Sequence, residues 1–214
     1  ELAAANWLAM ADLLRSEYPD SLLIDMGSTT TDIIPLNRFN QMLGQTDLTR
    51  LQQGYLVYCG LLRTNVATLI RSAIVNGCDT PVSTEFFAST GDAFVSLGLI
   101  PEDIFTADTA DRKGTDRTSC LRRLARVVCA DLEEIGEVGA LEIARAVIKA
   151  EEIQISDAIR QVKKRHQSRG LLVSGIGSGI ASRWFKGVDL AEAYGEYADA
   201  LPAYAVKKLL EQIR

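Results

Sequence analysis

The stretch Asp25-Met26-Gly27-Ser28-Thr29-Thr30-Thr31-Asp32 stands between two apolar runs, Leu22 to Met26 and Ile33 to Leu36, that are typical of strands. It therefore predicts the tight turn of a β-hairpin. Gly27 lets the backbone approach a ligand closely, and the hydroxyl residues after it, Ser28 to Thr31, offer hydroxyl and amide donors. The carboxylates of Asp25 and Asp32 can hold a divalent metal or orient a water. We expect a phosphate-binding turn; the alternative is a Ser/Thr-rich hairpin that binds nothing.

A second turn, Gly175-Ile176-Gly177-Ser178-Gly179, follows a predicted buried strand over residues 171–174 and precedes a short apolar helix. Strand, glycine turn and helix is the order that presents backbone amides and a helix N-terminus to a phosphate or a ribose. The turn does not match Gly-x-Gly-x-x-Gly, and it lacks the lysine of a P-loop. Its candidate binding residues are Gly175, Gly177, Ser178 and Gly179.

The rest of the chain shows an alternation of helical and extended patterns. Helices are expected over residues 2–15, 48–53, 119–132, 138–150, 156–166 and 198–213, with one more that ends at Leu97. Further strands are expected over residues 37–43, 54–58 and 71–75, the last followed by an Asn76-Gly77 turn. The polar segment 101–118 is expected to be a surface loop. This order predicts an α/β fold with a mixed sheet flanked by helices.

Composition limits the class of partner. The chain has 214 residues, 47% of them hydrophobic, a net charge of -5 and a pI near 5.0. Such a charge gives no attraction for nucleic acid or an anionic membrane, and no run of about 18 apolar residues predicts a membrane span. The four cysteines form no Cys-x-x-Cys zinc or redox pattern, so reduced thiols in a cytoplasmic protein are expected. His166, beside lysines, is expected to be a solvated surface residue.

Several other side chains are candidates for a site. Glu85 and Asp92 either face a cleft or sit at a helix N-terminus, where acids are favoured, and spacing does not separate these possibilities. Phe86, Phe87 and Tyr58 either stack on an aromatic ligand or belong to the core.

The two turns together resemble a known superfamily. The pattern Asp25-x-Gly27-x-Thr29-x-x-Asp32, with a glycine turn about 150 residues later, is similar to the second half of the actin-like (ribonuclease H-like) ATPase fold. The first turn also resembles, almost letter for letter, the central loop of the hydantoinase/oxoprolinase family. Within that family the chain is similar to the branch linked to tetrahydromethanopterin-dependent one-carbon transfer. Four further stretches carry this likeness: 4–7, 46–64, 83–88 and 106–111.

The resemblance implies a domain arrangement. Residues 1–16 would be a connecting helix from a missing N-terminal lobe, and residues 17–214 a second lobe with a helical insertion around 117–166. The chain does not start with methionine, which favours the same view. A homo-oligomer is possible.

The resemblance also implies a function. Archaeal members of the branch include a synthase of methanofuran biosynthesis, which joins an aminomethylfuran diphosphate to the phenol of glutamyl-tyramine and expels pyrophosphate. Ser28 to Thr31 would then hold phosphate, Asp25 and Asp32 would hold Mg²⁺ and take part in catalysis, and Glu85 or Asp92 would accept the phenolic proton.

Two alternatives stay open at this point. One is an ATP-dependent cyclic amide hydrolase of the hydantoinase/oxoprolinase type, or a small-molecule kinase, for which ATP turnover with a lactam would decide. The other is a nucleotide-binding module without turnover, which tight nucleotide binding and no chemistry would favour.

Overall fold

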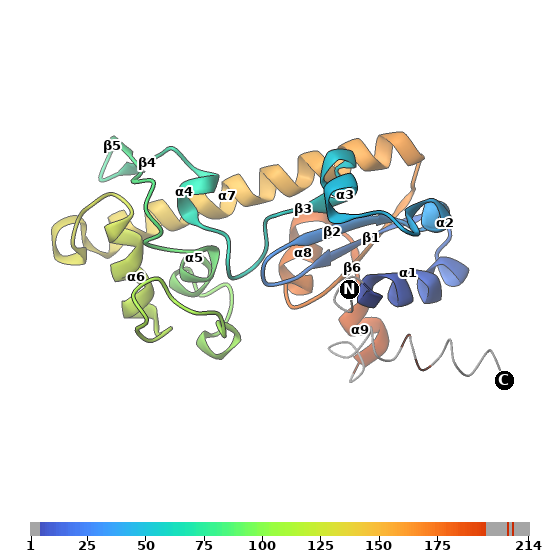
Figure 1. Ribbon diagram of the computed structural model, residues 1–214. Helices are drawn as coiled ribbons and strands as arrows, with labels where there is room; N and C mark the ends of the chain where they lie inside the picture. Colours follow the sequence, from blue (N-terminus) through green and yellow to red (C-terminus); the bar gives the residue numbers. More distant parts are fainter. Residues whose placement is uncertain (1–4, 196–204, 206, 208–214) are drawn as a thin grey trace. The chain divides into compact units, whose positions relative to one another are not determined.

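The computed structural model describes residues 5–195, 205 and 207, and the chain divides into two compact units (Figure 1). Unit 1 comprises residues 1–58 and 155–214, and unit 2 comprises residues 59–154. Each unit is described by itself. The expected helix over 198–213 lies almost wholly outside the described residues. No helix in the described ranges combines the length and the apolarity that crossing a membrane requires.

Unit 1 is built on a five-stranded sheet of order β3-β2-β1-β6-β7. β1 pairs antiparallel with β2, β2 antiparallel with β3, and β1 parallel with β6, which pairs parallel with β7. The predicted mixed sheet is therefore confirmed. The strand bounds are β1 Ser21–Met26, β2 Thr31–Pro35, β3 Leu56–Val57, β6 Gly170–Ser174 and β7 Val188–Asp189.

The apolar runs of the sequence explain which strands are central. Leu22, Leu23 and Ile24 of β1 are fully buried, and Leu172 and Val173 of β6 are buried beside them. A strand covered on both faces reads as a continuous apolar run, whereas a half-exposed strand alternates. β1 and β6 therefore occupy the middle of the sheet and lie side by side.

Helices and short turns complete unit 1. Helix α1 packs against β1, and α8 packs against β1, β6 and β7. The bounds are α1 Ala5–Glu17, η1 Leu36–Arg38, α2 Phe39–Met42, α3 Asp47–Gln53, α8 Ser178–Phe185 and α9 Leu190–Tyr194. Helix α7, Leu132–His166, contributes its end from Ile155 onward.

Two sequence predictions in unit 1 were wrong. The expected strand over 37–43 is helical, because Phe39 and Met42 are buried three positions apart, a helical spacing. His166 is not a freely solvated residue: its Nε2 lies 2.7 Å from the Tyr55 hydroxyl, and its carbonyl oxygen accepts from Asn37 at 3.0 Å. In addition, the expected strand over 54–58 shortens to β3.

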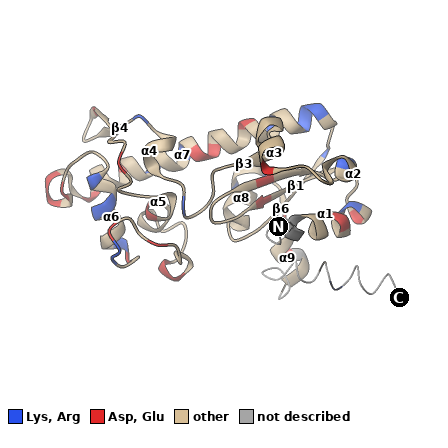
Figure 2. Ribbon diagram, in the orientation of Figure 1, with Lys and Arg blue, Asp and Glu red and all other residues tan. Residues whose placement is uncertain are grey.

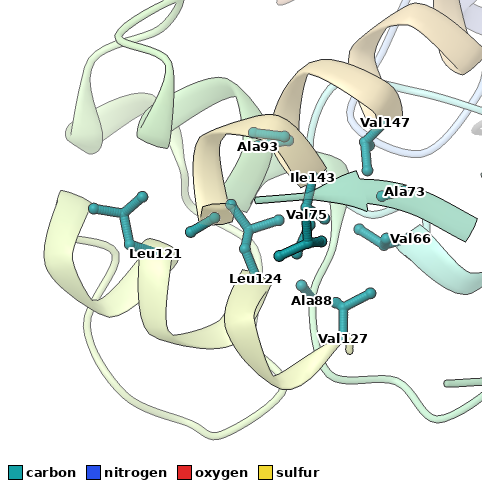
Figure 3. Packing of buried hydrophobic residues seen from close by; sticks show 12 residues of the cluster. Val66, Ala73, Val75, Ala88, Ala93, Leu121, Leu124, Val127, Ile143 and Val147 are labelled. Carbon is teal, nitrogen blue, oxygen red and sulfur yellow. The ribbon is translucent and has the colours of Figure 1, made fainter. Parts of the chain in front are cut away.

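Unit 2 packs helices around an aliphatic core (Figure 3). The cluster includes Leu121 and Leu124 of α6, Ile143 and Val147 of α7, and Val75 of β4. The elements are α4 Val66–Leu69, β4 Ser72–Val75, β5 Cys78–Pro81, α5 Thr90–Ser96, η2 Glu102–Ile104 and α6 Arg117–Arg126, together with the first part of α7. The Asn76-Gly77 turn joins β4 to β5, as predicted.

The expected separate helices over 138–150 and 156–166 are one continuous helix within α7, which is kinked nearer its start at Gly136 (φ 70°, ψ 173°). The segment between them, residues 151–155, holds neither glycine nor proline, so nothing in it interrupts the backbone hydrogen bonds. Asp157 pairs with Arg160 within this helix.

A buried carboxyl group, that of Glu151 on α7, stands out in unit 2. Glu151 is fully buried, and its carboxyl oxygens have no hydrogen-bond partner of standard geometry among the described residues. Burial raises the pKa of Glu151 to about 8, which a weak contact with the buried Cys59 thiol offsets only in part. Glu151 therefore stays protonated at neutral pH.

The raised pKa of Glu151 predicts a pH dependence of stability. Between about pH 4.5, the ordinary value, and about pH 8 the folded state keeps a proton that the unfolded state releases, so the free energy of unfolding falls as pH rises. Glu151→Gln should remove this contribution, so that its stability relative to the parent grows by about 1 kcal/mol per pH unit through that window. Urea unfolding at several pH values measures it.

Glu152→Gln, at the next position and partly exposed, is the matched control and should follow the parent curve. If the Glu151→Gln and parent curves ran parallel, the group would not titrate in this window.

Candidate functional site

The hairpin predicted around Gly27 is present. β1 and β2 pair with Asp25 opposite Asp32 and Met26 opposite Thr31, and the turn closes with the Gly27 N–H donating to the Thr30 carbonyl at 2.9 Å. A Cβ on Gly27 would lie 3.3 Å from the Thr30 oxygen, a tight contact that glycine avoids.

The hydroxyl residues of the turn do not all have the same exposure. Ser28, Thr29 and Thr30 are half-buried, and the hydroxyls of Ser28 and Thr29 lie 3.4 Å apart. Thr31, which pairs with Met26 across the β1–β2 ladder, is fully buried. Three hydroxyl groups of the predicted set are thus accessible to a ligand, and Thr31 serves the packing of the hairpin.

The two carboxylates are neighbours across the β1–β2 ladder but have different partners. Asp25 accepts a hydrogen bond from the Ser174 hydroxyl at 2.9 Å, and burial raises its pKa despite this bond. Asp32 accepts from the buried guanidinium of Arg50, which also donates to Asp47 at 3.1 Å. Burial, with a smaller contribution from the negative charge of Asp25, raises the pKa of Asp32 to about 6 although Arg50 lowers it.

The glycine turn after β6 lies directly against the end of β1. Parallel pairing sets Asp25 opposite Ser174, so the turns that follow the two strands share one edge of the sheet. The Gly177 N–H donates to the Met26 carbonyl at 2.9 Å. A Cβ on Gly175, whose φ is 86°, would lie 2.5 Å from that carbonyl, and one on Gly177 would lie 2.6 Å from Met26 Cγ.

These contacts give the glycines of the turn separate roles. Gly175 needs both a positive φ and space, whereas Gly177, with φ of -94°, needs space alone. Gly177 is also the N-cap of α8, and Ser178 opens that helix half-exposed. Gly179 is exposed, and nothing lies within 4 Å of the Cβ it lacks. The predicted turn is present, and Gly175 and Gly177 bind it to the hairpin.

The remaining candidates belong to unit 2, apart from Tyr58. Asp92 is buried at the start of α5, where its Oδ2 accepts from the Ser89 N–H at 2.8 Å and its Oδ1 from Arg123 at 2.7 Å. The helix N-terminus is therefore the correct alternative for Asp92. Glu85 lies exposed in the segment before α5. Among the aromatics, Tyr58 and Phe86 are exposed, and Phe87 packs at the edge of the core.

Sequence reasoning missed Arg50 and Ser174. Ser174 ends β6 in front of the glycine turn, but only the strand register shows that it lies beside Asp25. Arg50 follows the Thr46 cap of α3 on a helix with exposed leucines, so its burial was not evident from the hydrophobic pattern.

The glycine contacts predict a contrast between three substitutions. Gly175→Ala and Gly177→Ala each place a methyl group against the end of β1 and should lower the free energy of unfolding by roughly 1–3 kcal/mol. Gly179→Ala adds a methyl group in open space within a helix, so stability should be unchanged or rise by about 0.5–1 kcal/mol. Thermal and urea unfolding compare the three, and equal effects would show that the turn does not pack as described.

The Hydantoinase/oxoprolinase family model matches residues 1–204. A Methanocaldococcus jannaschii protein is 36% identical over 99% of this chain, and a Methanococcus vannielii protein is 33% identical over 89% of it. Both are named as synthase of a furan-2-yl-methanamine that carries a phenoxymethyl group with a gamma-L-glutamylamino-ethyl chain.

The chain spans 66% of the length of the Methanocaldococcus protein and 90% of the Methanococcus one. The α/β architecture and the mixed sheet are consistent with an actin-like fold. With the family model covering nearly the whole chain and both relatives above 30% identity, this chain belongs to the hydantoinase/oxoprolinase family.

Proposed function

We propose that the protein forms the aryl ether of a methanofuran-type cofactor, joining an aminomethylfuran diphosphate to the phenol of glutamyl-tyramine with release of pyrophosphate. The observation that carries the proposal is the shared name of the two relatives, whose product contains this ether, at 36% and 33% identity. The site at the carboxyl ends of β1 and β6 supports the proposal, because a diphosphate leaving group needs preorganised hydrogen-bond donors where negative charge develops.

The hairpin would hold the diphosphate. The accessible hydroxyls of Ser28, Thr29 and Thr30, with backbone amides of the turn, are positioned to donate to its oxygens. The start of α8, next to the turn through the Gly177–Met26 hydrogen bond, adds the positive end of a helix on the same edge. Leaving-group stabilisation in this proposal comes from groups that are fixed before the substrate arrives.

The carboxylates fit Mg²⁺ in number and type. Mg²⁺ is commonly bound by one or two carboxylates together with substrate phosphates. Asp25 and Asp32 face each other across the ladder, and both have a raised pKa, as expected of neighbouring buried carboxylates that a cation would stabilise in the charged form. No group of three or more metal-binding side chains occurs among the described residues, so oxygens of the diphosphate would complete the coordination. The ion would supply charge neutralisation on the departing pyrophosphate.

Proton acceptance from the phenol is assigned, within the proposal, to Glu85, whose carboxylate is exposed. Asp92 is excluded from this role, because Ser89 and Arg123 occupy both of its oxygens in the buried start of α5. The proposal also places the protein in the cytoplasm and in tetrahydromethanopterin-linked one-carbon metabolism.

Membership of the hydantoinase/oxoprolinase family favours one second candidate, ATP-dependent opening of a cyclic amide. The two functions separate in one experiment on the complete protein. Pyrophosphate release that requires Mg²⁺, the furan diphosphate and glutamyl-tyramine supports the synthase. ATP hydrolysis that requires a lactam or hydantoin, with no turnover of the furan diphosphate, supports the second candidate and rejects the first.

Asp25→Asn tests the carboxylate pair. The substitution keeps the size of the side chain but removes the charge proposed to hold Mg²⁺, so kcat should fall by about 100-fold or more, as for loss of one preorganised electrostatic group. Asp157→Asn, an exposed carboxylate on α7, is the control and should retain the parent rate. Circular dichroism verifies that both variants fold, and a folded Asp25→Asn with parent kcat would remove Asp25 from the reaction.

A further inference from the structure

A cavity of about 440 Å³ lies in unit 2, to which all its lining residues belong. Its lining includes Phe86, Phe87, Lys113, Arg122 and Arg126. The carboxylates of Asp111 and Asp131 also line it, and they pair with Arg123 and Arg126. This volume is in the range of small-molecule sites. Figure 2 shows basic residues gathered on α6.

One lining residue of the cavity, Arg123, is buried and hydrogen-bonded within the protein. Arg123 is 2% exposed and donates to Asp92 at 2.7 Å, to Asp111 at 3.0 Å and to the Gly114 carbonyl at 3.0 Å. This fixes the 111–114 loop on α6, and it uses the hydrogen-bonding capacity of Arg123 within the protein. Arg123 therefore has a structural role at the cavity, and any anionic ligand there would bind to other cations.

Three cations at the cavity remain accessible. Arg122 pairs with Glu133 at 2.9 Å and Arg126 with Asp131 at 3.2 Å, and all four side chains are more than half exposed. Exposed pairs of this kind contribute about 0–1 kcal/mol, so an incoming anion can compete for both guanidinium groups. Lys113 is exposed and makes no ion pair with any described residue.

Aromatic surface adjoins these cations. Phe86 is 46% exposed, and the Arg126 guanidinium lies over the Phe87 ring at 5.8 Å. The exposed Phe86 ring lies in the same cavity as cations whose ion pairs are absent or exposed. This combination is suited to a ligand that has both a ring and a negative charge.

We propose that this cavity binds a small aromatic anion, with its ring against Phe86 and its anionic group against Lys113, Arg122 and Arg126. The anionic group is a carboxylate or a phosphate ester. The proposal goes beyond the proposed function and does not depend on diphosphate chemistry at the hairpin.

Calorimetric titration of the complete protein with four probes tests the ligand class. 3-(4-Hydroxyphenyl)propionate joins a ring to a carboxylate, and phenyl phosphate joins a ring to a phosphate; 4-ethylphenol has the ring alone and propionate the carboxylate alone. At least one of the first two should bind about 10-fold or more tightly than both of the last two, and the tighter of them identifies the anionic group. Equal affinity for 4-ethylphenol and both anionic ring compounds, or no binding of either anionic ring compound, would overturn the proposal.

Variants then locate the binding. Lys113→Met keeps the aliphatic stem but loses the charge, and Phe86→Ala loses the ring; each should weaken the preferred probe by about 5-fold or more. Both side chains are exposed, so the fold should be retained, and Lys149→Met, an exposed lysine elsewhere in unit 2, should bind as the parent does. Parent affinity in both cavity variants would place the probe elsewhere.

Asp25→Asn separates this proposal from the proposed function. It should bind the aromatic anion with parent affinity even where turnover is lost. If the parent protein released no pyrophosphate, the proposed synthase function would be rejected. The binding of the aromatic anion to the cavity would still be established by the titrations.

Discussion

The parallel pairing of β1 with β6 is the constraint on which the candidate site depends. It sets Asp25 opposite Ser174, and so the hairpin turn and the glycine turn, about 150 residues apart in sequence, emerge at the same edge of the sheet. The hydrogen bond from Gly177 to the Met26 carbonyl and the close approach of Gly175 then hold the two turns together. A Cβ at Gly175 would clash with the Met26 carbonyl and one at Gly177 with the Met26 side chain, so a larger residue at either position requires the end of β1 to shift.

Burial of charge is the second feature of the site. Asp25 and Asp32 lie side by side with raised pKa, and Arg50 compensates only one of them directly. Buried like charges cost stability unless something neutralises them. In the proposed reaction this cost has a use, because the same carboxylates attract the cation that accompanies a diphosphate. The buried ionisable groups of unit 2 are stabilised in other ways. Arg123 and Asp92 form a buried salt bridge, and Glu151 stays protonated because its pKa is raised.

The sequence predicted the parts of the fold whose signals are local. The apolar runs of β1 and β6, the Gly27 hairpin, the Asn76-Gly77 turn and the strand–glycine turn–helix order all depend on neighbouring residues, and all are present. The errors arose where tertiary burial outweighs local pattern. Residues 37–43 alternate weakly between apolar and polar, yet Phe39 and Met42 are buried on a helix. Helix α7 continues through residues 151–155, whose charged start resembles the end of a helix.

The site was predictable in its loops but not in its partners. Gly27, Gly175 and Gly177 were identified from type and spacing, whereas Arg50 and Ser174 reach the carboxylates only through strand register and a buried helix face. Asp92 looked like a candidate acid because sequence shows neither its Arg123 partner nor its burial. Proximity in space, set by long-range pairing, is the information that a local pattern lacks.

The central claim is that the hairpin turn holds phosphate oxygens, and an experimental structure of the complete protein with Mg²⁺ and pyrophosphate tests it most directly. The account predicts pyrophosphate against Ser28, Thr29 and Thr30, with the metal at Asp25 or Asp32. Pyrophosphate bound elsewhere, with this turn untouched, would contradict it.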